Sequence, residues 1–119
     1  MEEFKVVEIG EMVPAFEEEM LIVLFGEQAP PELRAICVVH DYQASKDDVL
    51  QVGTKIRMGG QEYTLTKVGG AANANFAELG HVSIYFRQGE NDILPGAVIA
   101  EPMIFPKLAP GDTINIMNN

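Results

Sequence analysis

The sequence lacks several features that would place the protein in a membrane or in an oxidising compartment. No apolar run approaches the roughly 18 residues that a membrane-spanning helix requires, although 47% of the 119 residues are hydrophobic. The first residues, MEEFKVVEIGEMV, carry acids where a secretory signal peptide carries positive charge. The single cysteine cannot form a disulfide within the chain. We therefore expect one cytoplasmic domain over residues 1–119, without direct insertion into a membrane.

Basic residues are also scarce. Eight Lys and Arg residues stand against 18 Asp and Glu residues, and the basic residues form no cluster along the chain. Nucleic acid is therefore a poor candidate for a partner, because its phosphates require a basic binding surface. An excess of acids suits a basic partner protein, and it equally suits solubility alone.

Three common catalytic signatures are absent. The chain has no Gly-x-Ser-x-Gly elbow, no phosphate-binding glycine-rich loop that ends in Lys-Ser/Thr, and no Gly-x-Gly-x-x-Gly fingerprint. Residues 69–73, GGAAN, precede a predicted helix, where backbone N–H groups favour an anion, but an ordinary hinge explains them as well. The sequence thus indicates no cofactor.

Short strands separated by turns account for most of the chain. Gly59-Gly60 separates two strand-like segments and predicts a tight hairpin. Residues 81–87, HVSIYFR, place an apolar residue at every second position, which is typical of a half-buried strand. Strands are also predicted at residues 4–9, 20–25 and 35–39, and the segments VGTKI (52–56), PGAVI (95–99) and PGDTI (110–114) each place a glycine turn ahead of further strand-like residues.

Helix is predicted at two places only. Residues 71–79 have apolar residues at helical spacing, and Gly80 is a natural stop. Residues 30–34 resemble the first turn of a helix, with Pro31 at its first position. Residues 41–49 are expected to form a polar, mobile loop. The pattern predicts an all-β fold, a small closed β-barrel with one or two short helices in the connections.

His40 ends an apolar segment, and this is the clearest chemical signal in the chain. Alternation along a strand places Ile36, Val38 and His40 on one face and Cys37 and Val39 on the other. Burial at such a position disfavours the charged imidazole, and a neutral imidazole is a nucleophile. The same position also suits a histidine that only hydrogen-bonds at a strand end.

Metal binding is a less favoured alternative. Cys37 and His40 have the spacing of a zinc pair, but three residues along a strand span about 10 Å and point to opposite faces. The only other histidine is His81, so a metal site would need carboxylates to complete it. We therefore expect no metal.

Three segments together resemble the glucitol/sorbitol-specific enzyme IIA component of the bacterial phosphoenolpyruvate-dependent sugar phosphotransferase system. They are residues 20–40, 59–86 and 94–116, and their most specific parts are the strand that ends in His40, ELGHV (78–82) and LAPGD (108–112). The resemblance implies a small β-barrel phosphotransferase. It would accept a phosphoryl group from the histidine-containing phosphocarrier protein on one histidine and pass it to enzyme IIB of the sorbitol permease, whose IIC component lies in the membrane.

The resemblance also implies roles for particular residues. The phosphorylated histidine of the family maps onto His40. By analogy with other enzyme IIA classes, His81 would donate a hydrogen bond to the phosphoryl oxygens. The chemistry of the transfer adds one further role, because the ring nitrogen that does not react should donate to an oxygen that fixes the tautomer, and Asp41 or a nearby backbone oxygen would supply it. The competing hypothesis is a regulatory or binding barrel that has lost phosphotransfer, and the sequence leaves open whether the chain forms a homo-oligomer.

Overall fold

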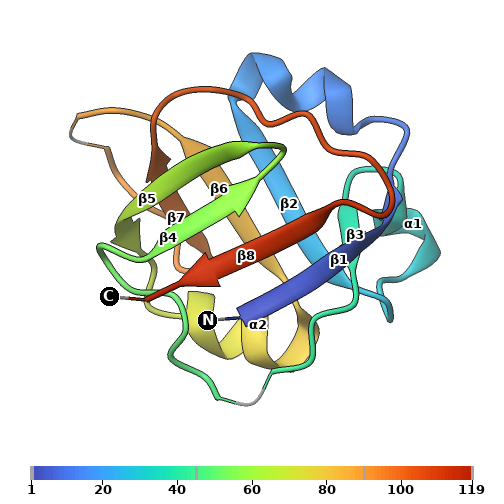
Figure 1. Ribbon diagram of the computed structural model, residues 1–119, viewed down its shortest axis with the longest axis horizontal. Helices are drawn as coiled ribbons and strands as arrows, with labels where there is room; N and C mark the ends of the chain where they lie inside the picture. Colours follow the sequence, from blue (N-terminus) through green and yellow to red (C-terminus); the bar gives the residue numbers. More distant parts are fainter. Residues whose placement is uncertain (1, 45, 90, 119) are drawn as a thin grey trace.

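The strands of the protein form one closed barrel. The computed structural model describes residues 2–44, 46–89 and 91–118, and in it the strands follow the order β1-β3-β2-β6-β7-β5-β4-β8, with β8 paired to β1 (Figure 1). The pairs β2–β3 and β6–β7 are parallel, and the other pairs are antiparallel. The strands are β1 (Glu2–Ile9), β2 (Leu21–Gly26), β3 (Val38–His40), β4 (Lys55–Met58), β5 (Gln61–Val68), β6 (Val82–Phe86), β7 (Ala97–Glu101) and β8 (Thr113–Met117). The predicted fold class is confirmed.

Two of the predicted local patterns are found in the barrel wall. Gly59 and Gly60 have φ values of 60° and 77°, which a two-residue hairpin turn requires, and they join β4 to β5. On β6, Val82, Ile84 and Phe86 are buried while the residues between them are partly exposed. Alternate residues of β6 therefore fill the barrel interior, as the period of two predicts.

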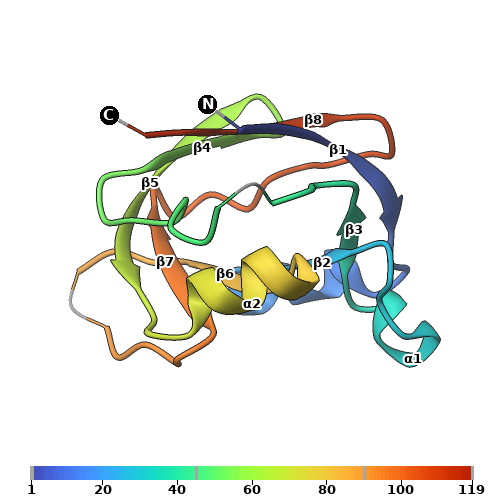
Figure 2. The ribbon, with the colours of Figure 1, turned by 90° about the horizontal axis from the view of Figure 1, so that it is seen from below.

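Short helices lie outside the barrel wall. The helix α2 (Ala72–Leu79) and the 3-10 helix η1 (Val13–Glu19) lie at opposite sides in Figure 1, and Figure 2 shows α2 from below. Ala72 and Phe76 of α2 and Val13 of η1 reach the main hydrophobic core. The helix α1 (Pro31–Arg34) is one turn long. No helix of the described residues is long and apolar enough to cross a bilayer.

The prediction of a strand at residues 35–39 is wrong over its first half. Residues 35–37 form a turn, because the N–H groups of Ile36 and Cys37 donate back to the carbonyls of Leu33 and Arg34. The N–H groups of Met12 and Gly10, after β1, then donate to the carbonyls of Ala35 and Cys37. Consequently Ile36 packs with the outer cluster of Phe25, Ala29, Cys37 and Val39, not with Val38. The helix η1 was not predicted, because its sequence VPAFEEE has no apolar stripe.

Candidate functional site

His40 lies at the rim of the barrel where β2 and β3 end. It pairs with Val6 of β1 and with Gly26 of β2, and its side chain points into the barrel with 0% exposure. The rings of Phe4 and Phe76 lie 4.8 and 5.8 Å from the imidazole, centroid to centroid. The strand-end histidine is therefore a fully buried polar group in an aromatic environment.

Backbone groups occupy both ring nitrogens of His40. The Nε2 atom lies 2.8 Å from the carbonyl oxygen of Gly80, and the N–H of Tyr42 donates to Nδ1 over 3.1 Å. A carbonyl only accepts and a backbone N–H only donates, so the ring is the neutral tautomer with its proton on Nε2. Burial lowers the pKa of His40 below its ordinary value, and the Gly80 carbonyl and Asp41 partly oppose that shift. The expectation of a neutral imidazole agrees with this geometry.

The Gly80 carbonyl reaches the imidazole because α2 ends there. Gly80 adopts a left-handed conformation with φ of 68°, and it terminates the helix as predicted. A Cβ atom at this position would lie 2.8 Å from the backbone nitrogen of Gly26 and 2.9 Å from Cε1 of His40. Sequence reasoning identified Gly80 only as a helix stop and missed its contact with His40.

Tyr42 is a second site residue that sequence reasoning missed. Its hydroxyl donates to Oε1 of Glu2 over 3.0 Å, and its ring stacks on Phe76 at 4.8 Å with an interplanar angle of 14°. The side chain is 9% exposed, and burial together with the hydrogen bond to Glu2 raises the pKa of Tyr42 to about 12. The segment that follows β3 thus packs between α2 and β1 (Figure 2). Its described residues in the range 41–49 form a loop as predicted, but the prediction of a polar loop is wrong at Tyr42 and Val49, which are buried. Ser45 lies outside the described residues.

Asp41 does not orient the imidazole. Its Oδ1 atom accepts a hydrogen bond from the backbone N–H of Lys5 over 2.8 Å, and its own N–H donates to the Lys5 carbonyl over 3.1 Å. Because consecutive residues of an extended chain point in opposite directions, the Asp41 carboxylate leaves the barrel where His40 enters it. The orienting oxygen belongs to Gly80, the backbone alternative that the sequence left open.

His81 lies on the other side of the barrel wall from His40. Its ring stacks on Phe25 with centroids 4.7 Å apart and an interplanar angle of 20°, and Phe25 belongs to the outer cluster. Burial lowers the pKa of His81 as well. The structure therefore does not bring the two imidazoles face to face, although the backbone of Gly80 connects their positions.

The described residues contain no group of three or more His, Cys, Asp or Glu side chains that would hold a metal ion. Cys37 is buried in the outer cluster, and His40 faces the interior. An apolar groove of about 240 Å³ lies between η1 and residues 105–108, but its lining does not include His40. The His40 imidazole is thus the chemically distinctive group at the rim of the barrel.

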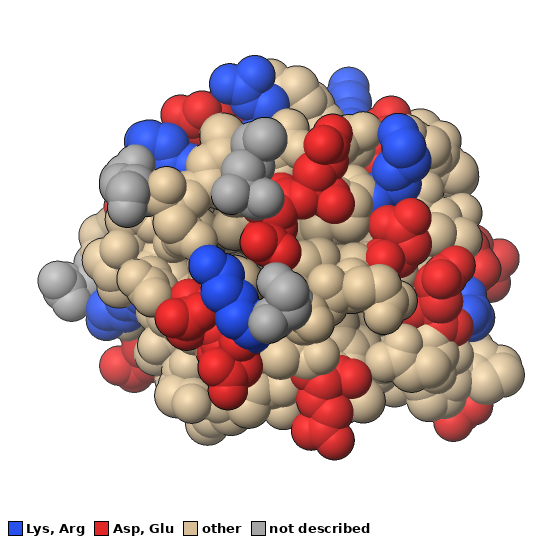
Figure 3. Space-filling model, turned by 60° about the horizontal axis from the view of Figure 1, so that its bottom comes forward, with Lys and Arg blue, Asp and Glu red and all other residues tan. Residues whose placement is uncertain are grey.

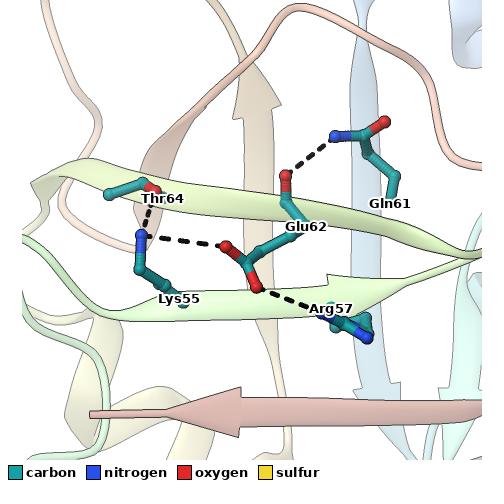
Figure 4. A network of polar contacts seen from close by, with 5 residues as sticks. All are labelled: Lys55, Arg57, Gln61, Glu62 and Thr64. Atoms are coloured by element: carbon teal, nitrogen blue, oxygen red, sulfur yellow. Dashed lines mark hydrogen bonds and ion pairs between the residues drawn. The ribbon is translucent and has the colours of Figure 1, made fainter. Parts of the chain in front are cut away.

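A polar network on the outer face of β4 and β5 is a different kind of feature (Figure 4). Glu62 lies 3.8 Å from Nζ of Lys55 and 3.3 Å from a guanidinium nitrogen of Arg57, while Lys55 also contacts Thr64 and the Gln61 side chain donates to the Glu62 carbonyl. Side chains there are about 40–58% exposed. Exposed ion pairs of this kind contribute roughly 0–1 kcal/mol to stability. The network contains no nucleophile, so we assign it to the solvated surface.

Acidic and basic side chains are mixed on the face of the molecule that lies toward the bottom in Figure 1. Figure 3 shows acidic side chains spread over this face with basic ones between them. Asp41, the residue after His40, is exposed, and so is Lys5, whose backbone N–H donates to the Asp41 carboxylate. The surface beside His40 therefore carries both charges.

Taken together, the fold and the site define a small closed β-barrel that holds one neutral imidazole at its rim. A sequence model of the family described as "PTS system glucitol/sorbitol-specific IIA component" matches residues 1–115, and the chain belongs to this family of the sugar phosphotransferase system.

Individual relatives agree with this assignment. The glucitol/sorbitol-specific EIIA component of Escherichia coli K12 is 32% identical over 102 residues, which cover 86% of this chain and 81% of the relative. The corresponding component of Shigella flexneri is 33% identical over 100 residues, covering 84% and 80%. The crystal structure of a PTS system IIA component from Enterococcus faecalis V583 has a TM-score of 0.88 and 32% identity, covering 98% of this chain and 99% of that one.

Proposed function

We propose that this protein is a phosphoryl carrier that uses His40 as its nucleophile. It accepts the phosphoryl group from the histidine-containing phosphocarrier protein and passes it to enzyme IIB of a glucitol/sorbitol permease. The observation that carries the proposal is the neutral, backbone-oriented imidazole of His40 in a chain of the IIA family. The sugar class comes from the names of the relatives, because the substrate of this step is a phosphoprotein.

The transfer is an in-line displacement at phosphorus. The lone pair of one His40 nitrogen forms the new N–P bond as the N–P bond of the donor phosphohistidine breaks. The donor ring leaves as a neutral imidazole when its second nitrogen carries a proton. His40 keeps the proton on its unreactive nitrogen and becomes a cationic ring, which an acceptor oxygen stabilises. Positioning and charge stabilisation therefore account for most of the catalysis that this chain supplies.

The excess of acids in the chain suits a basic donor surface. The chain has 18 Asp and Glu against 8 Lys and Arg, and Asp41 is exposed directly after His40. Complementary charges raise the rate of encounter more than they raise the affinity. We infer that the donor presents basic residues around its own phosphohistidine.

The test is reconstitution of the transfer. The protein is incubated with phosphoenolpyruvate, enzyme I and the phosphocarrier protein, and intact mass is measured before and after mild acid. We expect the gain of one acid-labile phosphoryl group, mapped to His40 by peptide mass spectrometry. A folded protein that gains no phosphoryl group would favour the alternative, a binding barrel in which His40 is a structural core residue.

A further inference from the structure

His40 is closed to reaction in this structure. Its side chain is 0% exposed, and each ring nitrogen already has a hydrogen-bond partner. A phosphorus atom must approach a ring nitrogen along the direction of its lone pair. Some part of the site therefore has to move before a phosphoryl group is accepted.

The moving part follows from the tautomer, whichever nitrogen attacks. If Nδ1 attacks, its lone pair must be released from the N–H of Tyr42. If Nε2 attacks, it must first lose its proton, and the remaining ring proton then sits on Nδ1. That proton would face the Tyr42 N–H, so that two donors would oppose one another without an acceptor. Both routes require the Tyr42 amide to withdraw from the imidazole.

The side chain of Tyr42 holds that amide in place. Its hydroxyl is bonded to the Glu2 carboxylate on β1, and its ring stacks on Phe76 of α2. On the far side of Tyr42 the chain is exposed at Gln43 and Ala44. On the near side, two hydrogen bonds between Asp41 and the Lys5 backbone anchor the chain to β1. From Tyr42 onward, the hydroxyl and the ring of Tyr42 supply the contacts that hold its amide against His40.

We propose that Tyr42 is a positioning residue that controls access to His40: its contacts with Glu2 and Phe76 keep the amide on Nδ1, and their release frees the imidazole for phosphoryl exchange. The proposal rests on the proposed function for its purpose. The existence of a closed and an open state of His40 does not depend on that function. The open state is a minor population in the free protein, and a docked phosphoprotein favours it by binding it selectively.

The two histidines allow access to be measured without any partner protein. Diethyl pyrocarbonate modifies neutral, accessible imidazole, and peptide mass spectrometry reports His40 and His81 separately. His81 is partly exposed and serves as the internal reference. In the wild-type protein we expect His40 to react far more slowly than His81, because only its open fraction reacts.

The test variant is Tyr42→Phe, which removes the hydroxyl and retains the ring. We expect the modification rate of His40 to rise about tenfold relative to His81, the change that corresponds to losing one hydrogen bond to a carboxylate. The matched control is Tyr63→Phe, since the Tyr63 hydroxyl donates to the Ile104 carbonyl over 2.7 Å and Tyr63 makes no ring contact with His40. An unchanged His40 rate in Tyr42→Phe, or an equal rise in Tyr63→Phe, would overturn the proposal.

A second pair of variants covers the case in which Tyr42→Phe does not fold. Glu2→Ala removes the acceptor of the same hydrogen bond, while Glu3→Ala removes its exposed neighbour on β1. Only Glu2→Ala is expected to accelerate the modification of His40. Equal rates in these two variants contradict the role of the Tyr42–Glu2 contact.

The ring nitrogens report directly on the contact between the Tyr42 amide and Nδ1. In the wild-type protein, ¹⁵N shifts of His40 should show one tautomer with its proton on Nε2, and Tyr42→Phe should move them toward a mixture of tautomers. Phosphoramidate, a small phosphoryl donor, should phosphorylate Tyr42→Phe faster than wild type.

If access changes as expected but reconstituted transfer never occurs, the proposed function fails while the control by Tyr42 stands. If transfer occurs and access is the same in all variants, the control by Tyr42 fails while the function stands.

Discussion

The two histidines of this protein occupy opposite sides of one barrel wall, and they differ in what fixes them. His40 points inward, with a backbone group on each ring nitrogen. His81 stacks on Phe25 on the outside and has no such pair of partners among the described contacts. Burial lowers the pKa of both. Burial alone therefore does not distinguish the chemistry of the two imidazoles, because within the described part of the chain only His40 has partners that define its tautomer.

Gly80 connects the two environments. Its carbonyl meets His40 inside the barrel, and the next residue places its imidazole outside. The left-handed turn at the end of α2 permits this sharp change of direction. One residue thus organises the interior site and separates it from the exterior one.

The largest effect is expected when the His40 imidazole is removed. His40→Gln should abolish the acid-labile phosphoryl gain, because an amide does not form the phosphohistidine. Since His40 is fully buried and hydrogen-bonded at both nitrogens, the variant should also lose about 1–3 kcal/mol of stability. Mass spectrometry gives the first effect and urea unfolding the second. A phosphoryl gain equal to that of the wild-type protein would assign the nucleophile elsewhere.

The next effect concerns the orienting carbonyl. Gly80→Ala places a Cβ against Gly26 and His40 at a positive φ, so we expect phosphorylation to slow by at least about tenfold and stability to fall by about 2–4 kcal/mol. The rate is followed by mass spectrometry at a temperature where the variant is folded.

Gly60→Ala is the matched control for this substitution. Gly60 also has a positive φ, of 77°, but no atom lies within 4 Å of its added Cβ. It should therefore lose only about 1 kcal/mol of stability and keep the wild-type rate. Equal slowing in both variants would mean that backbone strain, not the contact with His40, limits transfer.

A smaller effect appears in the dependence of stability on pH. Because the folded-state pKa of His40 lies below the ordinary value of 6.5, the unfolded chain binds more protons near and below that pH. Stability should therefore be complete above pH 6.5 and fall as the pH drops toward the folded-state pKa, by at most about 1.4 kcal/mol per pH unit for this group. Unfolding in urea between pH 5 and 7.5 measures the slope. His40→Gln should flatten it more than His81→Gln, because His40 is fully buried and His81 is partly exposed. Equal slopes in both variants would contradict this difference in burial.

Sequence reasoning predicted the barrel because local rules determine much of it. The Gly59-Gly60 turn, the alternation on β6 and the helix stop at Gly80 depend on neighbours in the chain. The turn at residues 35–37 was missed because it depends on the distant residue Gly10, whose added Cβ would lie 2.3 Å from the carbonyl oxygens of Arg34 and Ala35.

The site was predicted in part for a similar reason. His40 has a side chain whose chemistry is visible in a sequence, whereas its partners act through the Gly80 carbonyl and the Tyr42 amide. Every residue has such backbone groups, so their roles emerge only from the fold. Tyr42 had one available signal, since it is the second residue after His40 and an extended chain returns to the same face at that spacing.

The smallest expected effect tests whether His81 contributes to transfer at all. Because its ring lies on the outer wall against Phe25, we expect His81→Ala to be phosphorylated on His40 and to transfer more slowly by less than about tenfold, well short of the roughly 10²–10³ that a donor in direct contact supplies. Phe25→Leu keeps the imidazole but removes the stacked ring, which separates a chemical role of His81 from its packing. Single-turnover transfer from the phosphocarrier protein measures the rates of the wild-type protein and of both variants. A slower His81→Ala beside an unchanged Phe25→Leu would indicate that the imidazole reaches the phosphoryl group in the complex, whereas equal slowing would limit His81 to shaping the outer wall.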